Sequence, residues 1–232
     1  MYLASIAFIP DGNRRYAKAA GISLAEAYLQ GTQKAWQVME WLQQYPKITV
    51  GTFWALSNEN LQRSTLELKL LFRIFEKELD KAKENAFFEK NSVRINFIGR
   101  LQALPKKIQQ RAKELERLTE NFAKKTVNVA IGYGGRTEIV DAAKRIAEQY
   151  KQKKIDLEDL DEEEFKNYLY SRFPDPDLII RTSGTARLSG FLPYQSAYSE
   201  LYFCQKYWPE FSEQDLETAV KAYSERDRRY GR

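Results

Sequence analysis

The residues best suited to chemistry follow the first apolar run of the chain. The run IAFI (6–9) ends at Pro10 and is followed directly by Asp11, Gly12, Asn13, Arg14 and Arg15. A carboxylate can bind a hard cation, and guanidinium groups together with free backbone amides bind phosphate oxygens. The 232 residues include no histidine, so the commonest metal ligand and general base is missing. Any reaction must therefore depend on carboxylates, cations, hydroxyls and amides.

Three further segments place similar side chains at the ends of apolar runs. They contribute Ser57, Asn58, Glu59, Asn60 and Arg63, then YGGR (133–136), then Arg181, Thr182, Ser183, Gly184, Arg187 and Ser189. Each segment alone has a plain structural explanation, because Asp, Gly and Asn favour turns and SNEN (57–60) suits a solvated loop. The last segment, however, has two arginines six residues apart with hydroxyls and glycine between them, which suits phosphate oxygens. The four segments together predict a site for at least two phosphate groups.

The chain lacks the common nucleotide-binding signatures. Neither G-x-x-x-x-G-K-[ST] nor G-x-G-x-x-G occurs, which disfavours mononucleotides and dinucleotides as ligands. Asp11 and Glu200 are the two carboxylates predicted to share a hard cation with a diphosphate. Mg²⁺ is the expected cation, because magnesium prefers few protein carboxylates together with phosphate oxygens and water.

A sheet must position these loops. Short apolar runs alternate with longer amphipathic ones, which is typical of strands joined by helical crossovers. The predicted strands are residues 4–9, 48–56, 93–99, 127–133, 177–182 and 200–203. We therefore predict an α/β fold with one domain (1–232) and a central, mainly parallel six-stranded sheet flanked by helices. Ligands bind beyond the carboxyl ends of parallel strands, so the four polar segments belong to one rim.

Helices are predicted to begin at Ser23, Ser64, Thr137 and Ser212. Ser23 and Ser64 each precede a glutamate by three residues, which is the capping-box pattern. The helix after Ser64 carries an apolar stripe over roughly five turns, formed by Leu68, Leu71, Phe72, Phe75, Leu79, Ala82 and Ala86. Such a stripe suits either core packing or the wall of a deep apolar channel.

The composition restricts the partners of the protein. With 37 Lys and Arg against 32 Asp and Glu, the net charge is +5, an excess that accommodates anionic ligands without requiring nucleic acid. The one cysteine, Cys204, excludes an intramolecular disulfide and suits a reducing compartment. No run approaches the roughly 18 apolar residues of a membrane span, so we expect a soluble, cytoplasmic protein.

Six segments, taken together, resemble one known family. They are IPDGNRRYAK, LSNENLQRSTLE, VRINFIGR, VNVAIGYGGRTEIV, DLIIRTSGTARLSGFLPYQSAYSELYF and WPEF, and they follow one another along nearly the whole chain. They resemble the cis-prenyltransferases related to undecaprenyl diphosphate synthase. The resemblance implies that isopentenyl diphosphate is joined to an allylic prenyl diphosphate, with release of diphosphate, to form a cis polyprenyl diphosphate. It further implies Mg²⁺ as the cofactor, a homodimer, an apolar tunnel between the sheet and the helices that begin near Ser23 and Ser64, and a peripheral association with membranes through the product.

The resemblance also implies roles for individual residues. Asp11 and Asn60 correspond to catalytic residues, and Asp11 and Glu200 to metal ligands. The allylic diphosphate is implied to bind Gly12, Asn13, Arg14 and Arg15, with Asn60 and Arg63 assisting ionisation or positioning. The isopentenyl diphosphate is implied to bind Arg181, Arg187 and Ser189, and Ser57 is a further substrate-binding residue.

The chain departs from the family pattern mainly on the allylic side. Leu24 and Tyr28 stand where the family usually has an Arg and a His that hold the allylic diphosphate, and Thr185 replaces a usual Glu. The isopentenyl side is largely intact. The departures leave open the preferred allylic substrate, the product length, the joining position and the group that takes the proton.

Two alternative functions stay open at this point. One is a prenyltransferase with an atypical donor, acceptor or joining position, in keeping with Leu24 and Tyr28. The other is a non-catalytic partner subunit of a cis-prenyltransferase, which would be expected to lose the metal carboxylate and the diphosphate cradle, although Asp11 is present here. For the enzyme, Phe72 or Phe75 is predicted to stop chain growth.

Overall fold

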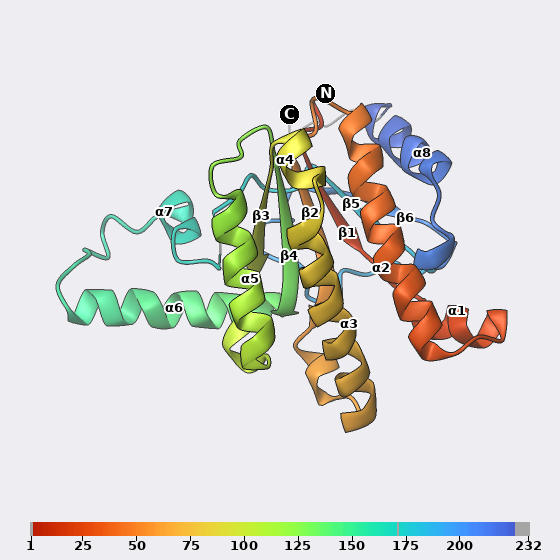
Figure 1. Ribbon diagram of the computed structural model, residues 1–232. Coiled ribbons are helices and arrows are strands. Elements are labelled where there is room, and N and C mark those ends of the chain that lie inside the picture. Colours follow the sequence, from red (N-terminus) through yellow and green to blue (C-terminus); the bar gives the residue numbers. More distant parts are fainter. Residues whose placement is uncertain (1, 171, 226–232) are drawn as a thin grey trace.

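One sheet organises the molecule. The computed structural model describes residues 2–170 and 172–225, and in these residues six strands form a single sheet in the order β3-β4-β2-β1-β5-β6 (Figure 1). The strands are β1 (Ser5–Ile9), β2 (Val50–Ser57), β3 (Val93–Ile98), β4 (Lys125–Tyr133), β5 (Leu178–Arg181) and β6 (Glu200–Phe203). All five neighbouring pairs are parallel. The predicted six-stranded α/β fold is confirmed, and the sheet is wholly parallel.

Helices connect the strands. They are α1 (Asn13–Ala20), α2 (Leu24–Trp41), α3 (Thr65–Glu84), α4 (Phe87–Asn91), α5 (Lys106–Thr119), α6 (Gly135–Lys151), α7 (Glu162–Lys166) and α8 (Glu213–Ser224), with short 3-10 turns η1 (Leu42–Gln44), η2 (Glu59–Gln62), η3 (Leu101–Ala103) and η4 (Trp208–Glu210). Ser23, Ser64 and Ser212 cap their helices as predicted. The helix predicted from Thr137 begins two residues earlier, at Gly135. Sequence analysis missed α1, α4, α5 and α7, of which only α7 has a side-chain cap at its start.

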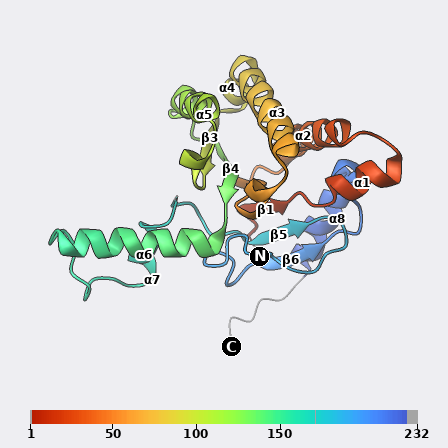
Figure 2. The same ribbon diagram turned by 90° about the horizontal axis from the view of Figure 1, so that it is seen from below.

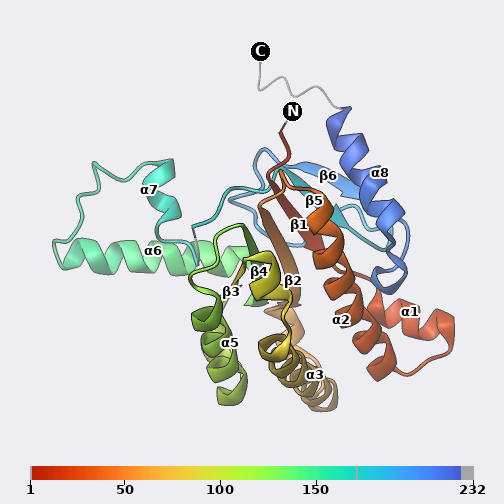
Figure 3. The ribbon, with the colours of Figure 1, turned by 45° about the horizontal axis from the view of Figure 1, so that its top comes forward.

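The two faces of the sheet carry different cores, because successive strand residues point to opposite sides. In β1, Ile6 and Phe8 belong to the larger core, whereas Ala7 and Ile9 belong to a smaller one. Residues of α2, α3, α5 and α8 complete the larger core. Figure 3 shows α2, α3 and α5 side by side over this face. Helices α2 and α3, which follow β1 and β2 in the chain, therefore cover this face of the sheet.

The apolar stripe of α3 is buried over most of its predicted length. Leu71, Leu79 and Ala82 are buried, and Ile74 joins them. The predicted continuation to Ala86 is wrong, because the helix ends at Glu84 and Ala86 is exposed.

Helix α6 projects from the body of the molecule, as Figures 1 and 2 both show. Its inner residues Ala142 and Ile146 pack with Tyr168 and Leu169 in a third, small cluster beside α7. In the described parts of the chain, no helix is both long and apolar enough to cross a bilayer.

A buried lysine ties the sheet to the end of α2. Lys125, the first residue of β4, is 6% exposed, and its Nζ donates to the carbonyl oxygens of Leu42 (2.8 Å), Tyr45 (2.8 Å) and Ile48 (2.6 Å). Burial lowers the pKa of Lys125 to about 8, so the ammonium group is still charged at pH 7. It is a second donor to the carbonyl groups of Leu42 and Tyr45, which also accept from the backbone N–H groups of Tyr45 and Ile48.

Replacing this lysine should destabilise the fold. Lys125→Met keeps the aliphatic stem but removes the buried ammonium group that donates to all three carbonyl groups, so we expect a loss of about 2–4 kcal/mol in the free energy of unfolding. Urea denaturation measures it. The neighbouring exposed Lys124→Met is the matched control, and a loss for Lys125→Met no larger than for this control would contradict the assigned role.

Candidate active site

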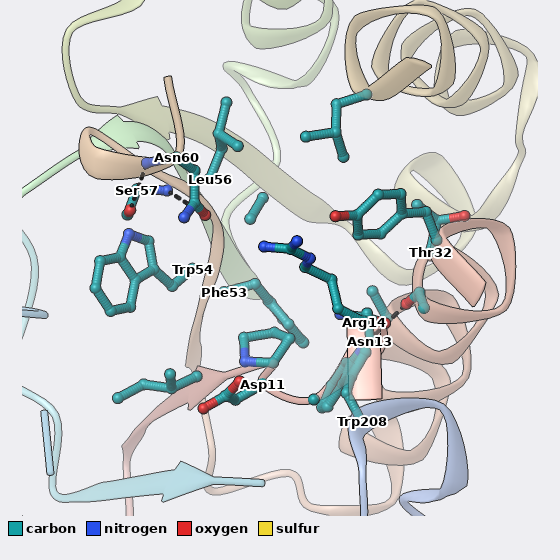
Figure 4. A pocket seen from close by; sticks show the side chains of 18 of the residues that line it. Asp11, Asn13, Arg14, Thr32, Phe53, Trp54, Leu56, Ser57, Asn60 and Trp208 are labelled. Carbon is teal, nitrogen blue, oxygen red and sulfur yellow. Dashed lines mark hydrogen bonds between the residues drawn. The ribbon is translucent and has the colours of Figure 1, made fainter. Parts of the chain in front are cut away.

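A cavity of about 600 Å³ opens at the carboxyl ends of β1 and β2 and extends between the sheet and helices α2 and α3 (Figure 4). Charged and polar residues line its mouth. Its interior is lined by apolar residues, including Ala35 of α2, Phe53 of β2, and Leu71, Ile74 and Phe75 of α3. The volume lies within the ~300–1,000 Å³ typical of ligand pockets. An elongated ligand with an anionic head and an apolar tail matches this distribution.

Asp11 occupies the centre of the mouth. Its Oδ2 accepts a hydrogen bond from Arg181 Nη2 at 2.7 Å, and its Oδ1 lies 3.4 Å from Arg15 Nη2. Burial alone would raise the pKa of Asp11, but the hydrogen bond from Arg181 and the charges of Arg181 and Arg15 outweigh burial and lower it. Asp11 is therefore an anion at neutral pH, and its side chain is still 28% exposed.

Gly12 allows the chain to turn from β1 into α1. Its φ of 100° is in the left-handed region. A Cβ there would lie 2.7 Å from Tyr207 Cδ1 and 2.9 Å from Ser183 Cβ. On the other side of the turn, the backbone N–H of Trp208 donates to the Asp11 carbonyl oxygen at 3.0 Å. The turn thus holds the N-terminal end of α1, with its unpaired backbone N–H groups, at the mouth of the cavity.

Asn13 and Arg14 begin α1 and both line the cavity. Figure 4 shows the Arg14 side chain projecting into the cavity. Asn13 Oδ1 is buried without a hydrogen-bond partner among the described residues. It lies against Gly31, where a Cβ would come within 2.5 Å of this oxygen. The close approach of α1 to α2 therefore requires glycine at position 31.

Ser57 and Asn60 bond to each other at the end of β2. The Asn60 backbone N–H donates to Ser57 Oγ at 3.1 Å, and the Ser57 N–H donates to Asn60 Oδ1 at 3.5 Å (Figure 4). Both residues line the cavity. The arrangement occupies the carbonyl oxygen of the Asn60 side chain, so its amide Nδ2 is the group that remains to donate to a ligand.

Arg63 lines the cavity and forms a cluster with Tyr28 and Glu67. Arg63 Nη1 donates to Tyr28 Oη at 2.8 Å and to Glu67 Oε1 at 2.9 Å, and the Tyr28 hydroxyl donates to Glu67 Oε1 at 2.6 Å. The Glu67 carboxylate therefore bonds to side chains outside its own helix and is not only part of the start of α3. Of the two departures in α2, Tyr28 joins the cavity lining, whereas Leu24 packs against the larger core.

The loop after β5 contributes the remaining predicted residues. Arg181 Nη1 donates to Ser189 Oγ at 2.8 Å and also to the carbonyl oxygen of Arg187. Arg181 and Ser189 line the cavity. Arg187 is exposed at its edge, where its Nε donates to Ser189 Oγ at 3.2 Å. The Arg181 guanidinium group therefore links this loop to Asp11.

Glu200 does not join this site. It is the first residue of β6 and pairs in register with Leu178, which pairs with Ile6, whereas Asp11 follows Ile9 at the other end of β1. The prediction that Glu200 and Asp11 share a cation is wrong within one chain. The carboxyl ends of parallel strands form the rim, and Glu200 begins its strand.

Sequence reasoning assigned no role to several aromatic residues of the site. Trp208 and Trp54 line the cavity. Trp54 stacks on Phe191 with ring centroids 5.0 Å apart, and the Arg15 guanidinium lies 5.7 Å from the centre of the Tyr207 ring. Trp54 lies within β2 rather than beyond its carboxyl end, so the rule of strand carboxyl ends did not select it. Tyr207 and Trp208 reach the site only through tertiary packing.

Comparisons with known proteins agree with this geometry. The family described as "Putative undecaprenyl diphosphate synthase" matches residues 9–231. The chain is similar to two proteins named "Tritrans,polycis-undecaprenyl-diphosphate synthase (geranylgeranyl-diphosphate specific)". The protein from Pyrobaculum aerophilum is 46% identical, and the match covers 98% of this chain and 95% of the relative. The protein from Thermoplasma acidophilum is 45% identical, and the match covers 98% of this chain and 88% of the relative.

A solved structure is also similar. It is the crystal structure of lavandulyl diphosphate synthase from Lavandula x intermedia in complex with dimethylallyl diphosphate, which is 33% identical, with a TM-score of 0.94 over 100% of this chain and 99% of that one. The family match and the relatives extend over nearly the whole chain and include each polar loop of the mouth. The chain therefore belongs to the undecaprenyl diphosphate synthase family of cis-prenyltransferases.

Proposed function

We propose that the protein condenses isopentenyl diphosphate with an allylic prenyl diphosphate, and that geranylgeranyl diphosphate is its preferred donor. The observation that carries this proposal is the cavity, in which a mouth rich in arginine continues into an apolar interior between the sheet and α3. The two archaeal relatives are named as specific for geranylgeranyl diphosphate, which supports the choice of donor. A cis polyprenyl diphosphate and free diphosphate are the products.

The allylic diphosphate binds at the start of α1 in this proposal. Backbone N–H groups from Asn13 onward and the Arg14 guanidinium supply fixed donors there. Bond cleavage between the allylic carbon and the diphosphate oxygen places negative charge on the leaving group, and these donors stabilise it without reorganisation. The electron pair of the isopentenyl double bond then forms the new carbon–carbon bond, and a proton is lost. The prenyl tail lies along Ala35, Leu71 and Phe75, which keep water away.

The isopentenyl diphosphate binds to the loop after β5 in this proposal. Arg181 and Ser189 line the cavity beside Asp11, and Arg187 flanks them from the exposed edge. These groups supply charge-assisted hydrogen bonds to a diphosphate that is not cleaved. Asn60 Nδ2, at the end of β2, is placed to donate to a substrate between the two sites.

Asp11 fits a site for Mg²⁺. Among the described residues, no group of three acidic, histidine or cysteine side chains could hold a metal ion. A single partly exposed carboxylate beside a diphosphate site is nevertheless the kind of environment that magnesium occupies, since it takes most of its ligands from phosphate oxygens and water. When bound, the ion would neutralise charge on the leaving diphosphate. The homodimer and the association with membranes stay predictions from the sequence.

The similarity to lavandulyl diphosphate synthase favours a second candidate function, an atypical condensation that uses a short donor. Its structure contains dimethylallyl diphosphate and matches this chain with a TM-score of 0.94. The cavity supports the longer donor. Its apolar lining continues inward to Leu71, Ile74 and Phe75, and a five-carbon donor would leave that part unfilled.

Donor preference tests the proposed function directly. Radiolabelled isopentenyl diphosphate is incubated with the purified protein and Mg²⁺ while dimethylallyl, geranyl, farnesyl and geranylgeranyl diphosphates are offered in turn. We expect the highest kcat/KM with geranylgeranyl diphosphate, because its tail buries the most apolar surface, and we expect products longer than the donor by chromatography. A preference for dimethylallyl diphosphate with a ten-carbon product would instead establish the second candidate.

The role of Asp11 is tested with asparagine rather than alanine, because Asp11→Ala would remove the acceptor of the buried Arg181 Nη2. Asp11→Asn keeps a carbonyl oxygen for Arg181 but loses the negative charge. We expect kcat to fall by about 100-fold or more, in a protein that is less stable but still folded at the assay temperature. Asp80→Asn, which alters the Asp80–Arg111 ion pair outside the cavity, is the matched control and should retain full activity. Turnover of Asp11→Asn above a tenth of wild type would exclude Asp11 from the mechanism.

The product length should depend on Phe75 rather than Phe72. Both lie on α3 and pack against the larger core, but of the two only Phe75 lines the cavity. A bulky ring on the cavity wall limits the growing chain by overlap. Phe75→Ala should therefore shift the dephosphorylated products towards longer chains in chromatography, and Phe72→Ala, the matched control, should not. Equal lengths in both variants would refute the assignment.

A further inference from the structure

The cluster of Tyr28, Arg63 and Glu67 joins three separate segments at the cavity mouth. Tyr28 belongs to α2, Arg63 follows η2, and Glu67 lies in the first turn of α3. The three contacts between them, from 2.6 to 2.9 Å, close a triangle around Glu67 Oε1, Tyr28 Oη and Arg63 Nη1. Each polar group at these corners is therefore held by the other two.

Two residues of the cluster face the cavity and the third does not. Tyr28 and Arg63 are among the lining residues, whereas Glu67 lies behind them with its side chain 11% exposed. Among the described residues, the hydrogen bonds of the Arg63 side chain are made through Nη1. A guanidinium group has five N–H donors, so Nε and Nη2 remain for an anion in the cavity.

Tyr28 is suited to hold this arrangement at any physiological pH. Burial, reinforced by the hydrogen bond to the Glu67 carboxylate, raises the pKa of the Tyr28 hydroxyl, so it stays protonated and continues to donate. It is also neutral. Tyr28 therefore fixes the arginine without adding a second charge to the mouth.

We propose that Tyr28 and Glu67 are positioning residues that hold the Arg63 guanidinium in one orientation, so that its remaining N–H groups bind the diphosphate of the allylic donor. The inference rests on the proposed function of the cavity. A flexible arginine loses rotamer freedom when it binds an anion, and an arginine already held by two partners loses less. Arg14, which projects into the same cavity, supplies a second guanidinium for the donor head group.

Deleting one hydroxyl tests the proposal. Tyr28→Phe keeps the ring packed and changes no charge, but Arg63 loses one of its two acceptors. We expect the dissociation constant for geranylgeranyl diphosphate, measured by calorimetry without isopentenyl diphosphate, to rise by about 3- to 10-fold. The constant for isopentenyl diphosphate alone should stay within about twofold. Tyr16→Phe is the matched control, since its hydroxyl donates to Gln30 Oε1 at 2.8 Å, outside the cavity lining.

Two substitutions of Glu67 separate positioning from charge. Glu67→Gln keeps an acceptor oxygen for both donors, whereas Glu67→Leu removes it, and both remove the negative charge. We expect Glu67→Leu to weaken binding of the allylic diphosphate at least as much as Tyr28→Phe, and Glu67→Gln to stay within about threefold of wild type. If Glu67 acted only through its charge, both variants would bind the anion more tightly and to the same extent. That result, or unchanged binding in Tyr28→Phe, would overturn the proposal.

Inorganic diphosphate separates this inference from the choice of donor. If the wild-type protein binds inorganic diphosphate and Tyr28→Phe weakens that binding, the positioning role stands even when geranylgeranyl diphosphate fails to bind, and only the proposed donor is lost. If neither inorganic diphosphate nor any allylic diphosphate binds to the wild type, the positioning role is excluded as well.

Discussion

The ion pair between Asp11 and Arg181 fixes the geometry of the mouth. β1 and β5 are neighbours in the sheet, and Ile9 pairs in register with Arg181, so the loops beyond both strands start side by side. Arg181 is 5% exposed, and breaking its pair would leave a buried charge without compensation. Thr182 strengthens the junction, because its Oγ1 accepts from the Asp11 N–H at 2.9 Å and donates to the Asp11 carbonyl oxygen at 2.8 Å. The start of α1 and the loop after β5 therefore cannot move independently.

The charges at the mouth are arranged before any substrate binds. Four arginines line it, and two carboxylates, Asp11 and Glu67, contact three of them. The mouth thus has two more guanidinium groups than carboxylates. Each paired arginine is oriented by its carboxylate, while the excess positive charge attracts phosphate groups. Donors that are already oriented stabilise developing charge without the reorganisation that water would need.

The rule that ligands bind beyond the carboxyl ends of parallel strands explains both the success and the failure of the sequence-based predictions. The strand runs were correctly identified, so the rule gathered Asp11, Arg14, Ser57, Asn60, Arg63, Arg181 and Ser189 at one rim, where the structure places them. Glu200 was predicted as a metal ligand although it begins a predicted strand, against this rule, and it lies at the other end of the sheet. Tyr28 was recognisable as a departure, but its partner Glu67 is 39 residues away in the chain, so their contact depends on how α2 and α3 pack. The helices α1 and α5 were missed because neither has the capping side chain on which the other predictions depended.

The cavity also affects the folding stability of the protein. It lies against the larger hydrophobic core, and residues such as Leu71 and Ile74 belong to both. Side chains that face an open cavity lack the van der Waals partners that close packing would give them. A bound prenyl tail supplies those partners, so the substrate completes the hydrophobic core of the folded chain. The free energy of unfolding consequently increases with the length of isoprenoid that the protein holds.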